Sequence, residues 1–168
     1  MSRSGYSDDC DGWALIRWRG AVKQAIRGKR GQAFLREALA TLDAMPEKKL
    51  VADSLHDPVV GQFCTLGAVG AARGMELSAI DPDDRESVAG NFGISEALAA
   101  EIMYENDFTG HDQMTERVVI CGPMRPHYPE WGQHERSFIV DNPRAGEIRW
   151  SRMRSWIESQ INKKPEAA

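Results

Sequence analysis

The sequence has 168 residues, of which 42% are hydrophobic, and a formal net charge of -4. This length and composition predict one compact domain and argue against a disordered chain. No apolar run approaches the roughly 20 residues of a membrane helix, and the first residues lack the apolar core of a signal peptide. Three cysteines, Cys10, Cys64 and Cys121, at irregular spacing argue against a disulfide framework, so we expect a cytoplasmic protein.

Charge is unevenly distributed along the chain. Residues 1–36 carry eight Lys/Arg against three acids, residues 76–116 carry eleven acids against Arg85, and residues 117–168 carry nine basic residues against six acids. The basic ends are expected either to pair with the acidic middle of the same fold or to face a phosphate backbone. Charge complementarity within the fold, together with ordinary solvation of the remaining charges, is the simpler interpretation.

Helical periodicity dominates the first part of the chain. Apolar residues at intervals of three and four predict a helix over residues 13–27 that ends at Gly28, and a second over residues 31–44 that ends before Pro46. These two helices are expected to form a helical hairpin. The other side of the first helix begins a basic stripe that continues past its end: Arg19, Lys23, Arg27, Lys29 and Arg30.

A change of pattern follows. Short apolar runs at residues 50–52, 59–60 and 63–64 lie on either side of Asp57-Pro58 and predict a small β-hairpin.

A helix over residues 66–73 is expected next, with Gly67, Gly70 and Gly74 on its surface. Glycine inside a helix costs up to about 1 kcal/mol relative to alanine. We therefore expect close backbone packing against the hairpin or another helix to compensate for that cost.

The acidic middle of the chain predicts two more helices. Asp81 is expected to cap the first, with Pro82 at its first position, and this helix runs to about residue 91. The second starts after Ser95, continues to about residue 105, and is expected to present its acids on a solvated face: Glu96, Glu101 and Glu105.

The segment from residue 111 to 143 is the least regular. Residues 118–121 and 137–140 read as strands that pair across a proline-rich loop, and a last helix is expected over residues 145–162. We thus predict a mainly α, α+β fold of helical hairpins packed around one or two small β-hairpins. The predicted organisation is a flexible arm (1–12), one globular domain (13–162) with an insertion (111–143), and a flexible tail (163–168).

Two short features carry a resemblance to other proteins. Residues 63–69 read Phe-Cys-Thr-Leu-Gly-Ala-Val, which contains Cys-x-Leu-Gly-[Val/Ala], and an Asn-Asp pair ends a later helix. This combination resembles small uncharacterised bacteriophage and prophage proteins with no assigned activity, over residues 13–107 and 148–161. The resemblance implies a bacterial host cytoplasm but no chemistry. The matching positions are Cys64, Leu66, Gly67, Asn106 and Asp107.

Few residues suggest catalysis. Cys64 lies where a strand meets a helix, which favours a thiolate, but its apolar neighbours favour a buried thiol. Asn106 and Asp107 are expected to cap a helix or turn, or alternatively to place a carboxylate beside the glutamates of the same helix. Four potential zinc ligands occur at a spacing that matches no common zinc site, which favours a chance grouping: His111, Cys121, His127 and His134. No catalytic residue, metal or cofactor is assigned.

Binding is the expected activity. A proline-stiffened loop offers aromatic contact area for a protein partner through Arg125, His127, Tyr128 and Trp131. We expect a non-enzymatic phage or prophage accessory protein that binds a host or phage macromolecule, interference with host defence being one such role. The alternatives are a small enzyme that uses Cys64 or an acidic cluster, and a nucleic-acid-binding protein that uses the basic stripe.

Overall fold

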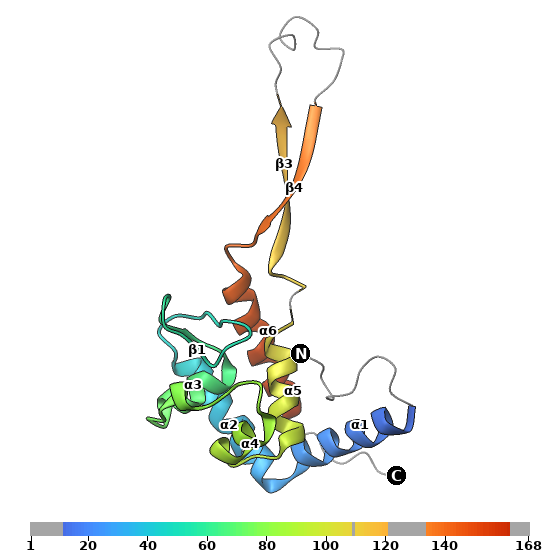
Figure 1. Cartoon of the computed structure of the whole chain (residues 1–168), viewed down its shortest axis with the longest axis vertical. Helices are drawn as coiled ribbons and strands as arrows, with labels where there is room; N and C mark the ends of the chain where they lie inside the picture. The colour runs from blue at the N-terminus through green and yellow to red at the C-terminus, as the bar shows by residue number, and fades with distance from the viewer. Residues whose placement is uncertain (1–11, 109, 121–133, 162–168) are drawn as a thin grey trace, which may run out of the picture. The chain divides into compact units, whose positions relative to one another are not determined.

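The computed structural model describes residues 12–108, 110–120 and 134–161. Six α-helices and two antiparallel sheets of two strands each make up this part of the chain (Figure 1), which confirms the mainly α, α+β class. The chain divides into two compact units, residues 1–108 with 146–168 and residues 109–145. None of the described helices combines the length and the apolar composition needed to cross a bilayer.

The two N-terminal helices form as the periodicity predicts. Helix α1 (Gly12–Arg27) buries Val22 and Ile26, and α2 (Lys29–Ala44) buries a stripe that includes Leu35. The extended backbone of Gly28, with φ of -66° and ψ of 152°, separates them. Helix α2 starts two residues before the predicted position.

The small β-hairpin around Asp57-Pro58 exists, but of the predicted apolar runs only Phe63 lies in a strand. The strands are β1 (His56–Asp57) and β2 (Gln62–Phe63), and the rings of His56 and Phe63 stack with centroids 4.6 Å apart. Val59 and Val60 are exposed in the turn, where the Asp57 carboxylate accepts the Val59 N–H. Leu50 belongs to the core without being in a strand. An apolar run reports burial, and burial here does not require strand pairing.

Helix α3 (Thr65–Ala72) packs by its glycines. A Cβ on Gly67 would lie 1.7 Å from the carbonyl oxygen of Leu55, so only glycine fits against the backbone that precedes the β-hairpin. Gly70 faces the side chains of Leu77 and Phe92. Gly74 lies beyond the helix end, with φ of +70°, so its predicted place on the helix surface is wrong.

The acidic middle holds a short 3-10 helix, η1 (Leu77–Ala79), followed by α4 (Arg85–Phe92) and α5 (Glu96–Asn106). The predicted Asp81 cap is wrong. The Asp81 carboxylate instead accepts the Asp83 N–H in a turn, and Asp84 caps α4 by accepting the Ser87 N–H. Ser95 caps α5 by accepting the Leu98 N–H.

Helix α5 lies in the centre of its unit. It packs against α1, α3 and α4, and its residues from Ala97 to Met103 are all buried. Glu101 is 4% exposed, so the prediction of a fully solvated acidic face is wrong. A helix surrounded on several sides buries residues that a one-sided amphipathic pattern assigns to solvent.

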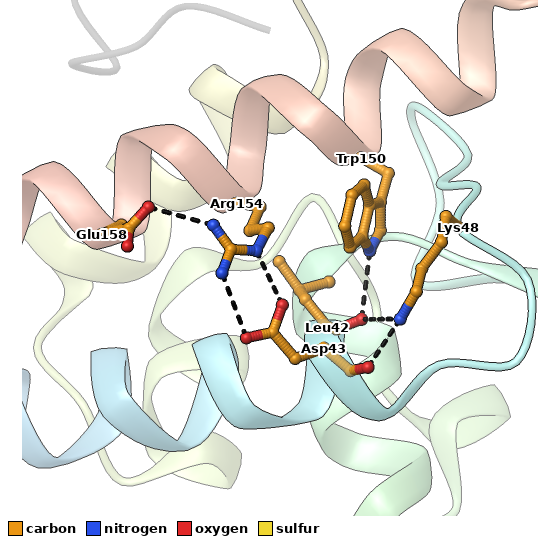
Figure 2. A network of polar contacts seen from close by, with 6 residues as sticks. All are labelled: Leu42, Asp43, Lys48, Trp150, Arg154 and Glu158. Atoms are coloured by element: carbon orange, nitrogen blue, oxygen red, sulfur yellow. Dashed lines mark hydrogen bonds and ion pairs between the residues drawn. The ribbon is translucent and has the colours of Figure 1, made fainter.

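Helix α6 (Ala145–Gln160) closes the helical unit by binding the C-terminal turn of α2 (Figure 2). The Trp150 indole N–H donates to the Leu42 carbonyl at 3.1 Å, and Lys48 donates to the Asp43 carbonyl at 2.6 Å. Arg154 binds both oxygens of the Asp43 carboxylate and lowers the pKa of that group. Carbonyls that a helix end leaves without partners are therefore satisfied by side chains.

The second unit is a hairpin of two eight-residue strands, β3 (Gln113–Ile120) and β4 (His134–Asp141). Both predicted strands form and both begin earlier in the chain than predicted, while Cys121 of the first lies outside the described residues. Asn142 closes the base of the ribbon, since its backbone N–H donates to the Asp112 carbonyl and its side-chain amide donates to the His111 carbonyl.

Replacing Gly67 by alanine is expected to lower the free energy of unfolding by about 3 kcal/mol or more, because backbone must move to admit the methyl group. Gly20→Ala is the matched control. Gly20 lies inside α1 with nothing within 4 Å of an added Cβ, so this change should raise stability by up to about 1 kcal/mol. Urea unfolding of the two variants checks the expectation, and equal effects would contradict it.

Candidate functional site

One buried polar junction includes three of the positions on which the resemblance rests: Cys64, Asn106 and Asp107. The Asn106 side-chain oxygen accepts the Thr65 backbone N–H at 3.0 Å and the Thr65 hydroxyl at 2.9 Å. Its amide nitrogen donates to the Val51 carbonyl at 2.8 Å and to the Asp107 carboxylate at 2.9 Å. The structural role expected for Asn106, with side-chain hydrogen bonds to backbone groups at a helix end, is confirmed, and its backbone partners lie in distant segments. The side chain ties α5 to α3 and to the loop before β1.

Arg149 of α6 enters the same junction. It is 7% exposed, and its guanidinium donates to the carbonyls of Asn106 and Leu50, each at 3.0 Å. The charge lies at the C-terminal end of α5, where the helix dipole favours a cation. The Leu50 N–H in turn donates to the Gly146 carbonyl. The N–H and the carbonyl of Leu50 therefore both bind residues of α6, which fixes α6 to the junction.

Cys64 is a structural residue of this junction. Its sulfur accepts the Gly67 N–H at 3.3 Å and caps α3, and the residue is 5% exposed. Burial raises the pKa of the Cys64 thiol to about 12. A nucleophilic cysteine needs an accessible thiolate, so the geometry argues against Cys64 as a nucleophile.

The acidic residues near the junction are also engaged. Glu105 forms an ion pair with Arg152 at 3.2 Å, which confirms pairing between the acidic middle and the basic C-terminal part. The Asp107 carboxylate accepts the Asp53 N–H at 3.0 Å. Asp53 itself has a left-handed backbone conformation, with φ of 59°. Burial raises the pKa of the Asp107 carboxyl, and hydrogen bonds from Asn106 and Asp53 oppose that effect. This arrangement fits a structural role for the carboxylate.

The β3–β4 hairpin presents a different kind of surface. In its register Met114 pairs with Val140 and Glu116 pairs with Phe138, and paired residues lie on the same face of a ribbon. Met114, Val118, Phe138 and Val140 therefore share one face, which also holds Glu116 and which we call the apolar hairpin face. Met114, Val118 and Phe138 are each more than 40% exposed.

Sequence reasoning missed Met114 as part of this surface. The even spacing of Met114 and Val118 was the available signal, because residues an even number of positions apart lie on one face of a strand, but Glu116 between them interrupts the apolar period of two. The predicted loop residues lie outside the described part of the chain: Arg125, His127, Tyr128 and Trp131.

The basic stripe is exposed as predicted. Among the described residues, its members form no ion pair or side-chain hydrogen bond with one another or with an acid. In the described part of the chain these cations are therefore solvated, which the simpler interpretation includes. Helix α1 contains four cations and no acid. The stripe is Arg19, Lys23 and Arg27 on α1, followed by Lys29 and Arg30 at the start of α2.

Of the four histidine and cysteine residues at irregular spacing, Cys121 and His127 lie outside the described residues. Within the described ranges, no three His, Cys, Asp or Glu side chains are grouped so as to hold a metal ion.

The fold and these surfaces define a mainly α, α+β protein with a buried polar junction and an exposed β-ribbon. No protein-family model matches the chain, and no solved structure matches it. It is similar to the nitrogen fixation protein NifU of Nostoc sp. (strain PCC 7120 / SAG 25.82 / UTEX 2576), with 35% identity over 82 residues. The match covers 48% of this chain and 26% of that protein, so the chain spans about a quarter of its length.

We expect the Cys64 thiol to resist alkylation in the folded protein. In a variant with Cys10 and Cys121 replaced by serine, iodoacetamide at neutral pH should label Cys64 only after urea is added. Because the folded pKa of about 12 exceeds the ordinary value of 9.0, stability from the buried neutral thiol is complete below the ordinary value and is lost as pH rises through the folded one. A Cys64→Ala variant should lack this alkaline component, and native labelling at the unfolded rate would contradict the assignment.

Proposed function

We propose that this protein is a non-enzymatic phage or prophage accessory protein that binds another protein, of the host or the phage, through the apolar hairpin face. The observation that carries the proposal is an apolar face on a ribbon that has no third strand among the described residues. Isolated two-stranded hairpins are at best marginally stable in water. A partner that covers this face would supply the missing burial.

The composition of the face suits a protein partner. Phe138, Met114 and Val118 offer aromatic and aliphatic side chains, and aromatic residues and Met are enriched at protein interfaces. Burying one such side chain fully contributes about 1.5–3 kcal/mol. The free edges of β3 and β4 add backbone groups that a partner strand can bind.

The non-enzymatic part of the proposal is supported by the polar junction. Cys64, Asn106 and Asp107 are engaged in burial or hydrogen bonds that hold segments of the chain together. The phage or prophage origin is supported by the resemblance at these positions, and we propose a host cytoplasm as the place of action.

Phe138→Ser should weaken partner capture by about tenfold or more, because the ring leaves the centre of the apolar hairpin face. Ile139→Ser is the matched control, since Ile139 is the next residue of β4, is 72% exposed and lies on the opposite face. Crosslinked capture from a bacterial host lysate, quantified by mass spectrometry, measures the effect. Equal loss in both variants, or no captured protein, would contradict this use of the face.

A second candidate function, nucleic-acid binding, is favoured by the cations of α1. Arg19, Lys23 and Arg27 follow one another at intervals of four residues, which places them about 6 Å apart along the helix. Such a row is able to follow phosphates, and binding of this kind weakens with salt.

Replacing Arg19, Lys23 and Arg27 together by alanine should lower the slope of log affinity against log salt by about 2 to 3 for a single-stranded oligonucleotide. The control exchanges the same three residues as Arg→Lys and Lys→Arg, which keeps the charge. Fluorescence anisotropy over a salt series separates the two variants. An unchanged slope in the alanine variant would exclude these residues as phosphate contacts.

A further inference from the structure

One face of α1 carries cations together with an exposed indole. Helix α1 lies at the edge of the helical unit (Figure 1), and its inner side buries Ala14, Val22 and Ile26. On its outer side the Trp13 side chain is 73% exposed. Tryptophan is highly buried on average in folded proteins. The core of this unit therefore does not account for the Trp13 indole.

The residues that share this face follow one another along the helix. Because α1 turns by about 100° per residue, the residues four, seven, eleven and fourteen positions after Trp13 lie within about 40° of it around the helix axis. All five residues are exposed. We call them the outer line of α1: Trp13, Arg17, Gly20, Gln24 and Arg27.

The outer line favours an anionic ligand. Arg17 and Arg27 contribute its charge, α1 contains no acid, and neither arginine pairs with an acid in the described part of the chain. Gly20 lies between the two arginines, with nothing within 4 Å of an added Cβ, so the helix surface there is open to close approach. Charge complementarity and an open surface together suit a phosphate backbone.

The indole narrows the choice to a single strand. Proteins bind single-stranded nucleic acids by stacking bases on aromatic side chains while Lys and Arg bind the phosphates. In a duplex the faces of the bases are stacked on one another, so only an unpaired strand offers a base face to Trp13. Arg17, one helical turn from Trp13, lies where the phosphate next to a stacked base is expected.

A membrane surface is the other anionic partner to be weighed. A helix that lies in a membrane interface directs a wide apolar face to the lipid. The structure describes every residue of α1, and among them only Trp13 and Ile16 are large, apolar and exposed. The apolar residues that recur at helical spacing, Val22 and Ile26, are buried in the core instead. The composition of the outer line therefore favours nucleic acid over lipid.

We propose that α1 binds single-stranded nucleic acid, with one base stacked on the Trp13 indole, the adjoining phosphate bound by Arg17 and a phosphate further along the strand bound by Arg27. This inference rests on the nucleic-acid-binding function proposed above as the second candidate. It adds the class of ligand, a single strand, and a contact to a base. The strand is DNA or RNA, since both offer the same bases and phosphates.

Fluorescence anisotropy with labelled strands of about 12 nucleotides tests the inference. Oligothymidylate is compared with an abasic strand of the same length, which has the same phosphates and no bases. We expect oligothymidylate to bind about fivefold or more tighter, because only this strand offers a base to Trp13.

Two substitutions of Trp13 isolate the stacking contact. Trp13→Leu keeps an apolar side chain without an aromatic face, so it should weaken oligothymidylate binding by about fivefold or more. The same variant should leave the affinity for the abasic strand and for a duplex within about twofold, and the salt dependence unchanged, since no charge is removed. Trp13→Phe is the matched control, because it keeps a ring at the same exposed position, and its affinity should stay within about threefold of the native value.

The outcomes separate this inference from the function on which it rests. Equal affinity for oligothymidylate and the abasic strand, equal weakening by the two substitutions, or weaker duplex binding in Trp13→Leu would overturn the stacking contact and leave salt-dependent phosphate binding in place. Absence of binding to every strand would overturn both.

Two further arms identify the source of the ligand. Vesicles of phosphatidylcholine and phosphatidylserine serve as the lipid probe, and loss of vesicle binding in Trp13→Leu with unchanged oligothymidylate binding would overturn the inference in favour of a membrane surface. Oligouridylate is compared with oligodeoxyuridylate, which lacks the 2′-hydroxyl groups. Tighter binding of oligouridylate assigns RNA, and equal or weaker binding assigns DNA.

Discussion

The helical unit depends on a fully satisfied buried amide. Asn106 is 1% exposed, and its side chain uses both acceptor positions on Thr65 and both donors on Val51 and Asp107. A buried amide that left any of these groups unpaired would cost free energy. This requirement explains why α5 must end where α3 begins and beside the loop at Val51. The orientation of the three segments follows from one side chain.

Arg149 extends that constraint to α6. The guanidinium binds the carbonyl of Asn106 itself, so the residue that joins α5 to α3 also receives α6. At the other end of the α6 interface, Trp150 and Arg154 bind the last turn of α2. The basic residues of the last helix are thus used to assemble the fold, and this distinguishes them from the cations of α1.

The buried residues that hold the fold together are therefore distinct from the exposed residues that we propose for binding. Cys64, Asn106 and Asp107 lie in the buried junction, where their side chains donate or accept hydrogen bonds. The exposed surfaces proposed for binding lie elsewhere, on the apolar hairpin face and along the cations of α1. The two surfaces differ in chemistry, since one offers apolar area and the other a row of exposed cations.

The sequence by itself determined the helical content, the helix pair joined at Gly28, the pairing of the last two strands and the close packing of Gly67, because periodicity and glycine placement are local signals. It misplaced β1 and β2, since an apolar residue such as Leu50 is buried equally well in a loop. Only the tertiary structure decided that Glu101 is buried, that Asn106 binds residues 41 and 55 positions away, and that Trp18 and Trp156 share a cavity. Those facts depend on which helices surround α5, and contacts between distant segments produce no periodic pattern in the amino-acid sequence.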